Sequence, residues 1–532
     1  MSSSPHGHDF DWLVVGSGFG GSVSALRLSE KGYSVGVLEC GRRFRDEDFA
    51  RTTWDVRRYY WLPRFGLKGI LRLSLFKDVF VASGCGVGGG SLGYANTLYR
   101  PTAGSAFYRD PQWVDLNDDW EATLAPHYAT AERMLGVTTC ESDGPADRLL
   151  RELSEELGVQ HTYSTTRVGV FFGAPGQTVE DPYFGGTGPE RTGCVRCGSC
   201  MVGCRYGAKN TLMKNYLWFA ERNGVEIMPE RTVVDVRPLG AEDGSDGYAV
   251  VSERSGSWLR KRRQVHTAQG VVIAAGALGT NRLLQRCRSR GALSQLSDRL
   301  GHLVRTNSEA ITAVTTKDDR HDFTRSVAIT SSIHPDESTH LENVTYGRGA
   351  DSMSFLFTLL TGAATSRTRF LKLVANSLRH PVLFLRTLWP GKWSRRTVIL
   401  LTMQTLDNSI RLLPKRGLLG FGMRLQTQED PDRPNPRFIP VANWATQRAA
   451  EKLDAVPQSG VTEALLNIPT TAHILGGAVI GAGPDRGVVD ANQRVFGYRN
   501  LFVCDGAAIP ANIGVNPSLT ITALAEHTNR LR

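Results

Sequence analysis

A glycine-rich turn near the start of the chain restricts the fold more than any other feature. Residues 11–15 are an apolar run typical of a buried strand, and Gly-Ser-Gly-Phe-Gly-Gly follows at 16–21. Residues 22–31 have the pattern of a helix that ends near a glycine, and residues 34–38 have the pattern of a second strand. This order predicts a strand–helix–strand unit at the start of an α/β fold.

Four residues of this unit have the positions that a dinucleotide site requires. Gly16 permits the tight turn, Gly18 lets the backbone approach a pyrophosphate, and Gly21 lets the helix pack closely on the strand. Glu39 ends the second strand, where a carboxylate accepts hydrogen bonds from both ribose hydroxyls and repels a phosphorylated ribose. The alternative is a tight turn that binds nothing; the flanking strand and helix, together with Glu39, favour a nucleotide site.

A second glycine-rich segment, Gly84–Ser91, carries few side chains that would keep a ligand away from its backbone. Its residues Gly88, Gly89 and Ser91 can lay their amides against a pyrophosphate or a flat ring. A flexible linker is the alternative. A linker is usually richer in serine and other polar residues, and it would not lead directly into leucine and tyrosine.

Two polar residues near the C-terminus are candidates for catalysis. His473 precedes a Gly-Gly pair, and Asn516 precedes Pro517 and a helical pattern. Asn followed by Pro predicts a helix N-cap, whose positive end would stabilise negative charge on a reduced flavin. A histidine beside the same ring can take an alcohol proton while hydride leaves for the flavin. By itself His473 would more often be a structural histidine, and its pairing with Asn516 favours catalysis.

Four of the nine cysteines lie close together in the sequence. Cys194, Cys197, Cys200 and Cys204 have the C-x2-C-x2-C-x3-C spacing of ferredoxins, which predicts an iron–sulfur cluster. In ferredoxins the fourth cysteine serves a second cluster and precedes proline, whereas Arg205 follows here, so a three-iron cluster or an incomplete cubane is also compatible. Zinc usually needs two separated cysteine pairs and ranks lower. A metal-free thiol cluster remains an alternative.

The composition indicates a large folded protein without nucleic-acid signatures. The 532 residues carry a formal net charge of +10 and are 41% hydrophobic, which predicts two intertwined domains around a bulky cofactor. No helix-turn-helix, zinc-finger or RNA-binding pattern is present, so we expect no nucleic-acid partner. Residues 1–9 are polar, and no run approaches the ~18–20 apolar residues of a membrane span. We therefore expect a cytoplasmic protein, or one bound peripherally to a membrane.

The motifs together closely resemble the glucose–methanol–choline (GMC) oxidoreductases and, within them, the cholesterol-oxidase branch. The resemblance covers residues 12–40, 84–100, 270–284 and 470–531. It implies a Rossmann-like FAD-binding domain interleaved with an α+β substrate-binding domain. The expected segments are a first FAD-binding part (1–118), a helical and loop insertion (119–190), a second FAD-binding part with the cysteines (191–304), a substrate or lid domain (305–455), and a C-terminal FAD-binding part with the catalytic residues (456–532).

The resemblance also implies roles for individual residues. The residues that match His473 and Asn516 are the catalytic pair of the family. Asn96 corresponds to a residue beside the flavin, and Asp505, which Gly506 follows, corresponds to one near the cofactor's phosphate or ribitol chain. Glu342 resembles the carboxylate that shifts the steroid double bond; its alternative is an exposed strand glutamate. Two features depart from the family pattern: isoleucine follows His473 where proline is usual, and the cysteine cluster is absent from the secreted cholesterol oxidases.

These features predict an FAD-dependent enzyme that oxidises a secondary alcohol on a large apolar substrate, such as a 3β-hydroxysterol, with double-bond isomerisation. One alternative is a GMC dehydrogenase that passes electrons through an iron–sulfur cluster to an acceptor other than oxygen. Another is a flavin- or lipid-binding protein without turnover. The alcohol, the electron acceptor and the oligomeric state stay open at this level.

Two segments mix basic with apolar and aromatic residues and predict docking to a membrane surface. They span residues 59–72 and 370–393. In the second, Lys372, Arg379 and Arg386 repeat at heptad spacing, and Pro381 is expected to break the helix between them. The alternative is that the apolar residues of both segments line a buried substrate cavity.

Overall fold

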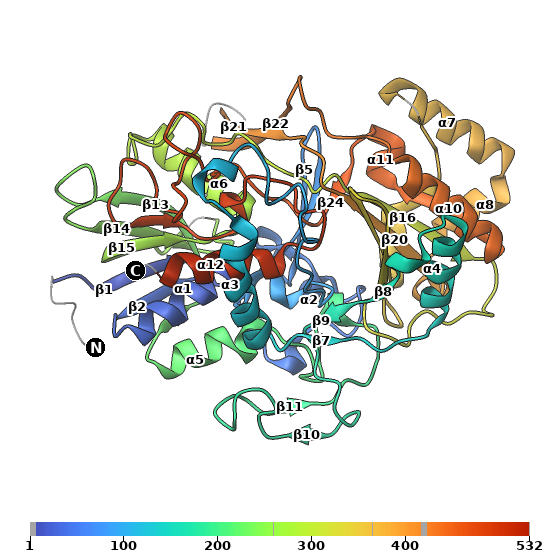
Figure 1. Cartoon of the computed structure of the whole chain (residues 1–532), viewed down its shortest axis with the longest axis horizontal. Helices are drawn as coiled ribbons and strands as arrows, with labels where there is room; N and C mark the ends of the chain where they lie inside the picture. Colours follow the sequence, from blue (N-terminus) through green and yellow to red (C-terminus); the bar gives the residue numbers. More distant parts are fainter. Residues whose placement is uncertain (1–6, 259, 364, 417–422, 531–532) are drawn as a thin grey trace.

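The computed structural model describes residues 7–258, 260–363, 365–416 and 423–530. Two seven-stranded sheets lie toward opposite ends of the molecule, with loops and short strands between them (Figure 1). The chain passes repeatedly from one sheet to the other: the strands of the first sheet come from residues 10–273 and 501–503, and those of the second from residues 164–460. The mixed α/β architecture predicted from the sequence is confirmed.

The first sheet has the order β12-β2-β1-β15-β14-β13, and β25 also pairs with β15. Its strands β12, β2, β1, β15 and β25 run parallel, whereas β13 and β14 form an antiparallel ladder with β15. Helices cover both faces of the parallel part, with α1, α3, α5 and α12 below it and α6 above it in Figure 1. Coverage on both faces explains why these strands are short apolar runs without alternation. The strands are β1 (Phe10–Val15), β2 (Val35–Leu38), β12 (Glu226–Met228), β13 (Arg231–Pro238), β14 (Tyr248–Arg254), β15 (Gln264–Ile273) and β25 (Leu501–Val503).

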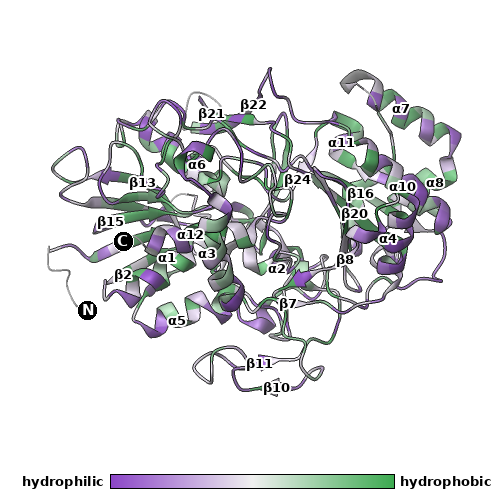
Figure 2. Cartoon of the chain, viewed as in Figure 1, coloured by the Kyte–Doolittle hydropathy of each residue, from purple (hydrophilic) through white to green (hydrophobic). Residues whose placement is uncertain are grey.

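The second sheet is antiparallel throughout, with the order β19-β23-β16-β20-β18-β17-β8. Apolar residues of α4 and α10 pack on one face of it. Figure 2 shows the alternation of hydrophobic and hydrophilic residues on the helices at this end. The strands are β8 (Ser164–Thr165), β16 (Ala310–Thr316), β17 (Ile329–Asp336), β18 (Thr339–Val344), β19 (Phe357–Leu359), β20 (Thr397–Gln404) and β23 (Ala455–Gly460).

The remaining strands form short pairs, except that β5, β6 and β24 make a three-stranded sheet. They are β3 (Trp61–Leu62), β4 (Leu67–Lys68), β5 (Leu71–Leu75), β6 (Phe80–Gly84), β7 (Thr138–Thr139), β9 (Arg167–Val168), β10 (Thr178–Val179), β11 (Arg191–Thr192), β21 (Ile410–Arg416), β22 (Met423–Glu429) and β24 (Thr470–Thr471). The helices are α1 (Phe19–Glu30), α2 (Val56–Tyr59), α3 (Trp120–Met134), α4 (Pro145–Glu156), α5 (Tyr216–Arg222), α6 (Gly276–Ser289), α7 (Ser366–Arg379), α8 (Pro381–Leu388), α9 (Trp393–Arg396), α10 (Pro440–Lys452), α11 (Val461–Leu466) and α12 (Ser518–Arg530).

Most of the element predictions agree with the structure. The predicted strand–helix–strand unit corresponds to β1, α1 and β2. The break at Pro381 is confirmed, because α7 ends at Arg379 and α8 begins at Pro381. The segment expected as a helical and loop insertion (119–190) contains α3 and α4, with the short strand β7 between them. No helix in the described ranges is long and apolar enough to span a membrane.

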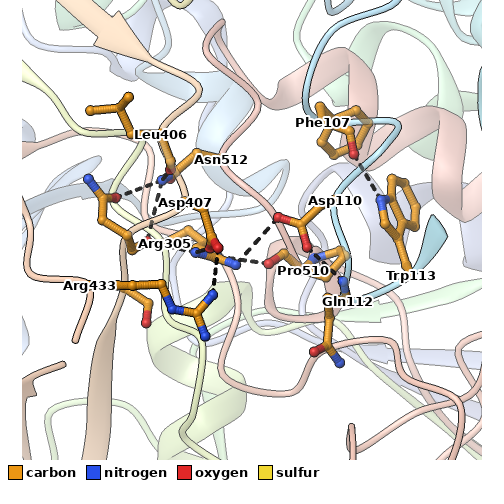
Figure 3. A network of polar contacts seen from close by, with 12 residues as sticks. Phe107, Asp110, Gln112, Trp113, Arg305, Leu406, Asp407, Arg433, Pro510 and Asn512 are labelled. Atoms are coloured by element: carbon orange, nitrogen blue, oxygen red, sulfur yellow. Dashed lines mark hydrogen bonds and ion pairs between the residues drawn. The ribbon is translucent and has the colours of Figure 1, made fainter. Parts of the chain in front are cut away.

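A buried arginine ties together four segments that lie between the sheets (Figure 3). The Arg305 guanidinium donates to the Pro510 carbonyl at 2.8 Å and to the Asp407 carboxylate at 2.7 Å, and it lies 3.6 Å from Asp110. Asp407 also pairs with Arg433. Because Arg305 is 1% exposed, these partners compensate for the burial of its charge. The network fixes the start of the segment that leads into β16 against the loop that precedes α12.

Candidate active site

The turn after β1 has the close backbone contacts that the glycine motif predicts. A Cβ at Gly16 would lie 2.3 Å from the Ala274 carbonyl oxygen, and one at Gly21 would lie 2.0 Å from the Gly16 carbonyl oxygen. A Cβ at Gly89 would lie 2.6 Å from the Cα of Gly18, so the two glycine loops meet backbone to backbone. The N-terminus of α1, which starts at Phe19, is therefore open to a phosphate without side chains in the way.

Glu39 is held at the end of β2 by donors from the same turn. Its carboxylate is 4% exposed and accepts hydrogen bonds from the Ser17 amide at 3.1 Å, the Ser17 hydroxyl at 2.8 Å and the Gly41 amide at 2.8 Å. The acidic group thus lies beside the phosphate turn, where a ribose would replace the serine hydroxyl as a donor.

The second glycine loop is held by Ser91. The Ser91 hydroxyl donates to the Gly88 carbonyl at 2.6 Å and accepts from the Leu212 amide at 3.0 Å. Gly88 and Gly89 have φ of +101° and +53°, a region that glycine enters without strain. The side chain of Ser91 therefore fixes the shape of the loop. The backbone amides of the neighbouring glycines remain as the groups that could bind a ligand.

Two buried asparagines have polar atoms without a partner in the described structure. Both side-chain polar atoms of Asn96 are orphaned, and so is Oδ1 of Asn516. Asn96 also has a φ of +70°, in the left-handed region that asparagine tolerates better than most residues. Buried polar groups are normally hydrogen-bonded, so these atoms indicate a missing polar ligand. Together with the glycine cradle they fit a flavin dinucleotide.

Asp505 joins the end of β25 to α6. Its carboxylate accepts from the amides of Gly276 and Ala507, both at 2.8 Å, and from the Thr280 hydroxyl at 2.6 Å. Burial raises the pKa of Asp505 to about 6. Gly506 lets this turn pack on Leu475, since a Cβ there would lie 2.9 Å from the leucine side chain. Asp505 is therefore linked to the N-terminus of α6.

His473 is fixed by a buried carboxylate. Its Nδ1 forms a hydrogen bond with Oε1 of Glu309, whose Oε2 accepts from the Ala472 amide at 2.8 Å. The chain around His473 is anchored on one side by β24 and on the other by a bridge between Arg305 and Leu475. Burial lowers the pKa of His473, but the charge and hydrogen bond of Glu309 outweigh this effect and raise it above the usual value.

The three predicted catalytic residues converge although they are far apart in sequence. Nδ2 of Asn516 lies 3.4 Å from Nε2 of His473 and 3.4 Å from Oε2 of Glu342. Glu342 belongs to β18, and its side chain is fully buried rather than exposed on the strand. Burial raises the pKa of Glu342 to about 8, while His473 and Asn516 act in the opposite direction. The site thus holds a carboxyl group that titrates near neutral pH.

The prediction that Asn516 caps the last helix is wrong. Helix α12 begins at Ser518, and Oδ1 of Asn516 accepts no hydrogen bond from the helix amides. The side chain instead turns its amide toward His473 and Glu342. Its position is set by Asn307, which accepts from the Gly514 amide at 2.8 Å and donates to the Val515 carbonyl at 3.0 Å.

Glu309 and Asn307 are functional candidates that the sequence patterns did not reveal. Both lie in the short segment between Arg305 and β16, where no motif or spacing singles them out. Asn307 holds the loop of Asn516, and Glu309 holds His473. The signal in the sequence that could have indicated Glu309 is its position as an acidic residue directly before a mostly apolar strand pattern.

The four clustered cysteines line one cavity beside Lys209. Burial raises the pKa of Cys194 to about 11 and that of Cys200 to about 12. Among the residues described, the only three metal-binding atoms found within 4.8 Å of one another belong to Glu39, Cys40 and Cys85. The four sulfurs therefore do not have the spacing of a single tetrahedral zinc ion. An iron–sulfur cluster spaces its cysteines more widely because they bind different irons, and it stays a prediction for this cavity.

Comparisons with known proteins identify the family. Family models described as GMC oxidoreductase match residues 188–292 and 417–525. A cholesterol oxidase of Mycobacterium tuberculosis is 51% identical, over 98% of this chain and 91% of that protein, and one of Acinetobacter baumannii is 46% identical, over 98% and 93%. The crystal structure of pyridoxine 4-oxidase from Mesorbium loti shares the fold, with a TM-score of 0.61 at 16% identity over 98% of both chains. The chain belongs to the GMC oxidoreductase family and is an FAD-dependent alcohol oxidoreductase.

Proposed function

We propose that this protein oxidises the 3β-hydroxyl group of a sterol to a ketone, passes the electrons to oxygen and moves the sterol double bond. The observation that carries the proposal is the convergence of His473, Asn516 and Glu342 at distances of 3.4 Å around one amide group. The cholesterol oxidases that align over nearly the whole chain support the substrate class.

The alcohol proton is taken by His473. The Glu309 carboxylate occupies Nδ1, so Nε2 is the ring nitrogen that points into the site and accepts the proton. The two glycine loops, Glu39 and Asn96 would hold FAD, which when bound would supply the hydride acceptor for the carbinol carbon. Asn516 donates toward both His473 and Glu342 and orients the hydroxyl between them. The organic product of this step is the ketone.

Glu342 carries the second step. In a 3-keto-5-ene steroid the carbon between the ketone and the double bond is acidic, so a carboxylate can remove its proton and return it at the far end of the former double bond. A group with a pKa of about 8 is suited to accept and return a proton near neutral pH. The buried ring of His340 lies 3.9 Å from Glu342, and burial keeps the pKa of His340 well below its usual value, so it adds no charge.

A projecting apolar surface gives a sterol a route from a bilayer. Helices α7 and α8 stand out from the second sheet in Figure 1, and we call their exposed apolar residues the α7–α8 face. It comprises Phe370, Leu371, Val374, Leu378, Val382, Leu385, Leu388 and Trp389. Leu378 is 77% and Trp389 is 75% exposed, and the basic residues Lys372, Arg379 and Arg386 accompany them. Aliphatic and aromatic side chains flanked by positive charge suit an anionic lipid surface.

The structure corrects the extent of the predicted docking surface. Trp393 is 3% exposed and stacks on Phe357, and Leu373 is also buried. In the earlier segment, Tyr59, Trp61 and Ile70 belong to the core, and only the tip around Leu62 and Phe65 is exposed. We therefore propose docking through the α7–α8 face alone.

The decisive experiment is anaerobic reduction of the purified flavoprotein with a panel of alcohols. The flavin absorbance should bleach with 3β-hydroxy-5-ene sterols, and air should restore it with formation of hydrogen peroxide. Bleaching by the sterol with reoxidation only by an artificial acceptor would indicate the dehydrogenase alternative. No bleaching with any alcohol would contradict the proposal and leave a flavin-binding protein without turnover.

A further inference from the structure

Two cysteines outside the four-cysteine cavity form a close pair next to the nucleotide part of the flavin site. Cys40 directly follows Glu39 at the end of β2, and Cys85 directly follows β6 at the start of the second glycine loop. Their sulfur atoms lie 3.5 Å apart although the residues are 45 positions apart in sequence. Cys40 is half-buried and Cys85 is buried.

The backbone holds this pair at a separation that a disulfide can close. A Cβ at Gly41 would lie 2.3 Å from the Gly86 nitrogen and 2.4 Å from the Gly86 Cα, so the residues that follow the two cysteines are in direct backbone contact. A disulfide needs a sulfur–sulfur distance of about 2.0 Å. The two sulfur atoms, 3.5 Å apart, therefore need to approach by only about 1.5 Å to form the bond.

The surroundings favour one thiolate in the pair. Arg72 donates from Nη2 to both sulfur atoms at 3.4 Å, and the Cys40 thiol lies 3.4 Å from Oε1 of Glu39. The hydrogen bond from Cys85 and the positive charge of Arg72 lower the pKa of Cys40 although burial and the Glu39 carboxylate oppose them, whereas burial raises the pKa of Cys85. Cys40 is thus the nucleophile, and Cys85 is the thiol that resolves the reaction.

We propose that Cys40 and Cys85 are a redox modification site that a peroxide converts to a disulfide. The Cys40 thiolate attacks one peroxide oxygen, an S–O bond forms, the O–O bond breaks and one water leaves. The Cys85 sulfur then attacks the oxidised Cys40 sulfur, an S–S bond forms and the second water leaves. In total, two thiols are oxidised and one hydrogen peroxide is reduced to two waters. The oxidant is the product of the proposed oxidase reaction, and the inference rests on that function only for its source.

The modification is coupled to the cofactor through Glu39. Formation of the disulfide removes the Cys40 thiol that lies next to Oε1 of Glu39, the carboxylate expected to bind the ribose. It also moves the Cys40 side chain. FAD bound beside Glu39 would shield the half-buried Cys40 from peroxide and so slow its oxidation. The disulfide, which moves the Cys40 side chain beside Glu39, would in turn weaken flavin binding.

The test compares holoenzyme with excess FAD and the same protein depleted of flavin, both treated with hydrogen peroxide in the presence of a chelator. As a control for folding, FAD is added back to the depleted protein under reducing conditions. If the protein is native, it binds the added FAD and quenches the flavin fluorescence again. Peptide mass spectrometry should find a Cys40–Cys85 linkage in depleted protein, reversible by dithiothreitol and formed at least about tenfold more slowly with FAD bound. The oxidised protein should bind FAD about tenfold more weakly by fluorescence titration.

Cys40→Ser and Cys85→Ser should abolish this linkage, and Cys287→Ser, which changes a buried thiol of α6, should leave it intact. Absence of the linked peptide from depleted wild-type protein overturns the inference, even if the serine variants fail to fold. Equal rates of linkage with and without FAD overturn the coupling. Neither readout uses sterol turnover, so failure of the proposed function would not be mistaken for failure of this inference.

Discussion

The Glu309 carboxylate forms a hydrogen bond with Nδ1 of His473, and the two residues are 164 positions apart in the chain. This contact leaves Nε2 as the ring nitrogen that faces Asn516, 3.4 Å away. A carboxylate behind an imidazole fixes its tautomer and stabilises the cation that forms when the ring accepts a proton. The pair therefore gives His473 both its direction and its basicity.

Replacing His473 by Ala should lower the rate of flavin reduction by about 10²-fold or more, because the alcohol then lacks a general base. FAD should remain bound, since His473 is not part of the glycine cradle. Stopped-flow reduction under anaerobic conditions measures the rate, and the flavin spectrum measures occupancy. His161→Ala, at an exposed position, is the control. Loss of flavin, or a rate within about twofold of wild type, would contradict the assignment.

Glu309→Gln should shift the pH dependence of flavin reduction toward lower pH, because the carboxylate raises the pKa of His473. The maximal rate should also fall, since the ring loses a partner that fixes its orientation. A pH profile that is lower everywhere but not shifted would indicate a purely structural role.

The contact between Glu309 and His473 also links the stability of the fold to pH. The pKa of His473 is higher in the folded protein than its unfolded value of 6.5. The stabilisation that the Glu309–His473 contact contributes is therefore full below pH 6.5 and is lost as the pH rises through the folded pKa of His473. The advantage of wild type over Glu309→Gln in free energy of unfolding should thus shrink with rising pH.

Glu342→Gln should still oxidise a 3β-hydroxy-5-ene sterol but release the unisomerised ketone. Chromatography of the products distinguishes the two ketones, and an unchanged ratio would rule out the assigned role.

The pKa of Glu342 is raised from 4.5 to about 8 in the folded state, so ionisation of Glu342 opposes folding. Relative to the Gln variant, wild type should lose stability between pH 4.5 and about pH 8, at about 1.4 kcal/mol per pH unit. Denaturant unfolding of both proteins at pH 5 and pH 8.5 measures this difference.

Leu378→Glu combined with Leu385→Glu should weaken binding to anionic vesicles, because both residues lie on the α7–α8 face and are mostly exposed. Wild-type protein should co-sediment with such vesicles, and salt should reduce the bound fraction. Val265→Glu places one such charge on β15 at the opposite end of the molecule and should have little effect, and each single variant, Leu378→Glu or Leu385→Glu, is compared with it (Figure 1). Wild-type protein that ignores vesicles of every composition would contradict docking.

Protein purified without oxygen should contain iron and acid-labile sulfide if the cavity of Cys194, Cys197, Cys200 and Cys204 holds a cluster. Metal analysis and absorbance beyond the flavin bands measure this directly. Cys197→Ser with Cys200→Ser should remove the iron and leave the flavin, since the cavity is separate from the glycine loops. An iron content near zero in wild type would leave a metal-free thiol cluster as the remaining explanation.

The sequence by itself determined the parts of this protein that depend on local interactions. The glycines of 16–21, Glu39 and the runs that became β1, α1 and β2 are neighbours in the chain, so their spacing encodes the turn directly. His473 and Asn516 were found because each belongs to a short motif with its own pattern.

Only the tertiary structure decided how the site is assembled. It turned Asn516 away from its helix, buried Glu342 beside it, brought Glu309 to His473 and buried Trp393 under Phe357. It also placed Cys40 against Cys85. These contacts join residues from separate strands and loops, and no periodicity or spacing along the chain records them. Their energies, and the pKa values that follow from burial, arise only when the two sheets and their loops pack together.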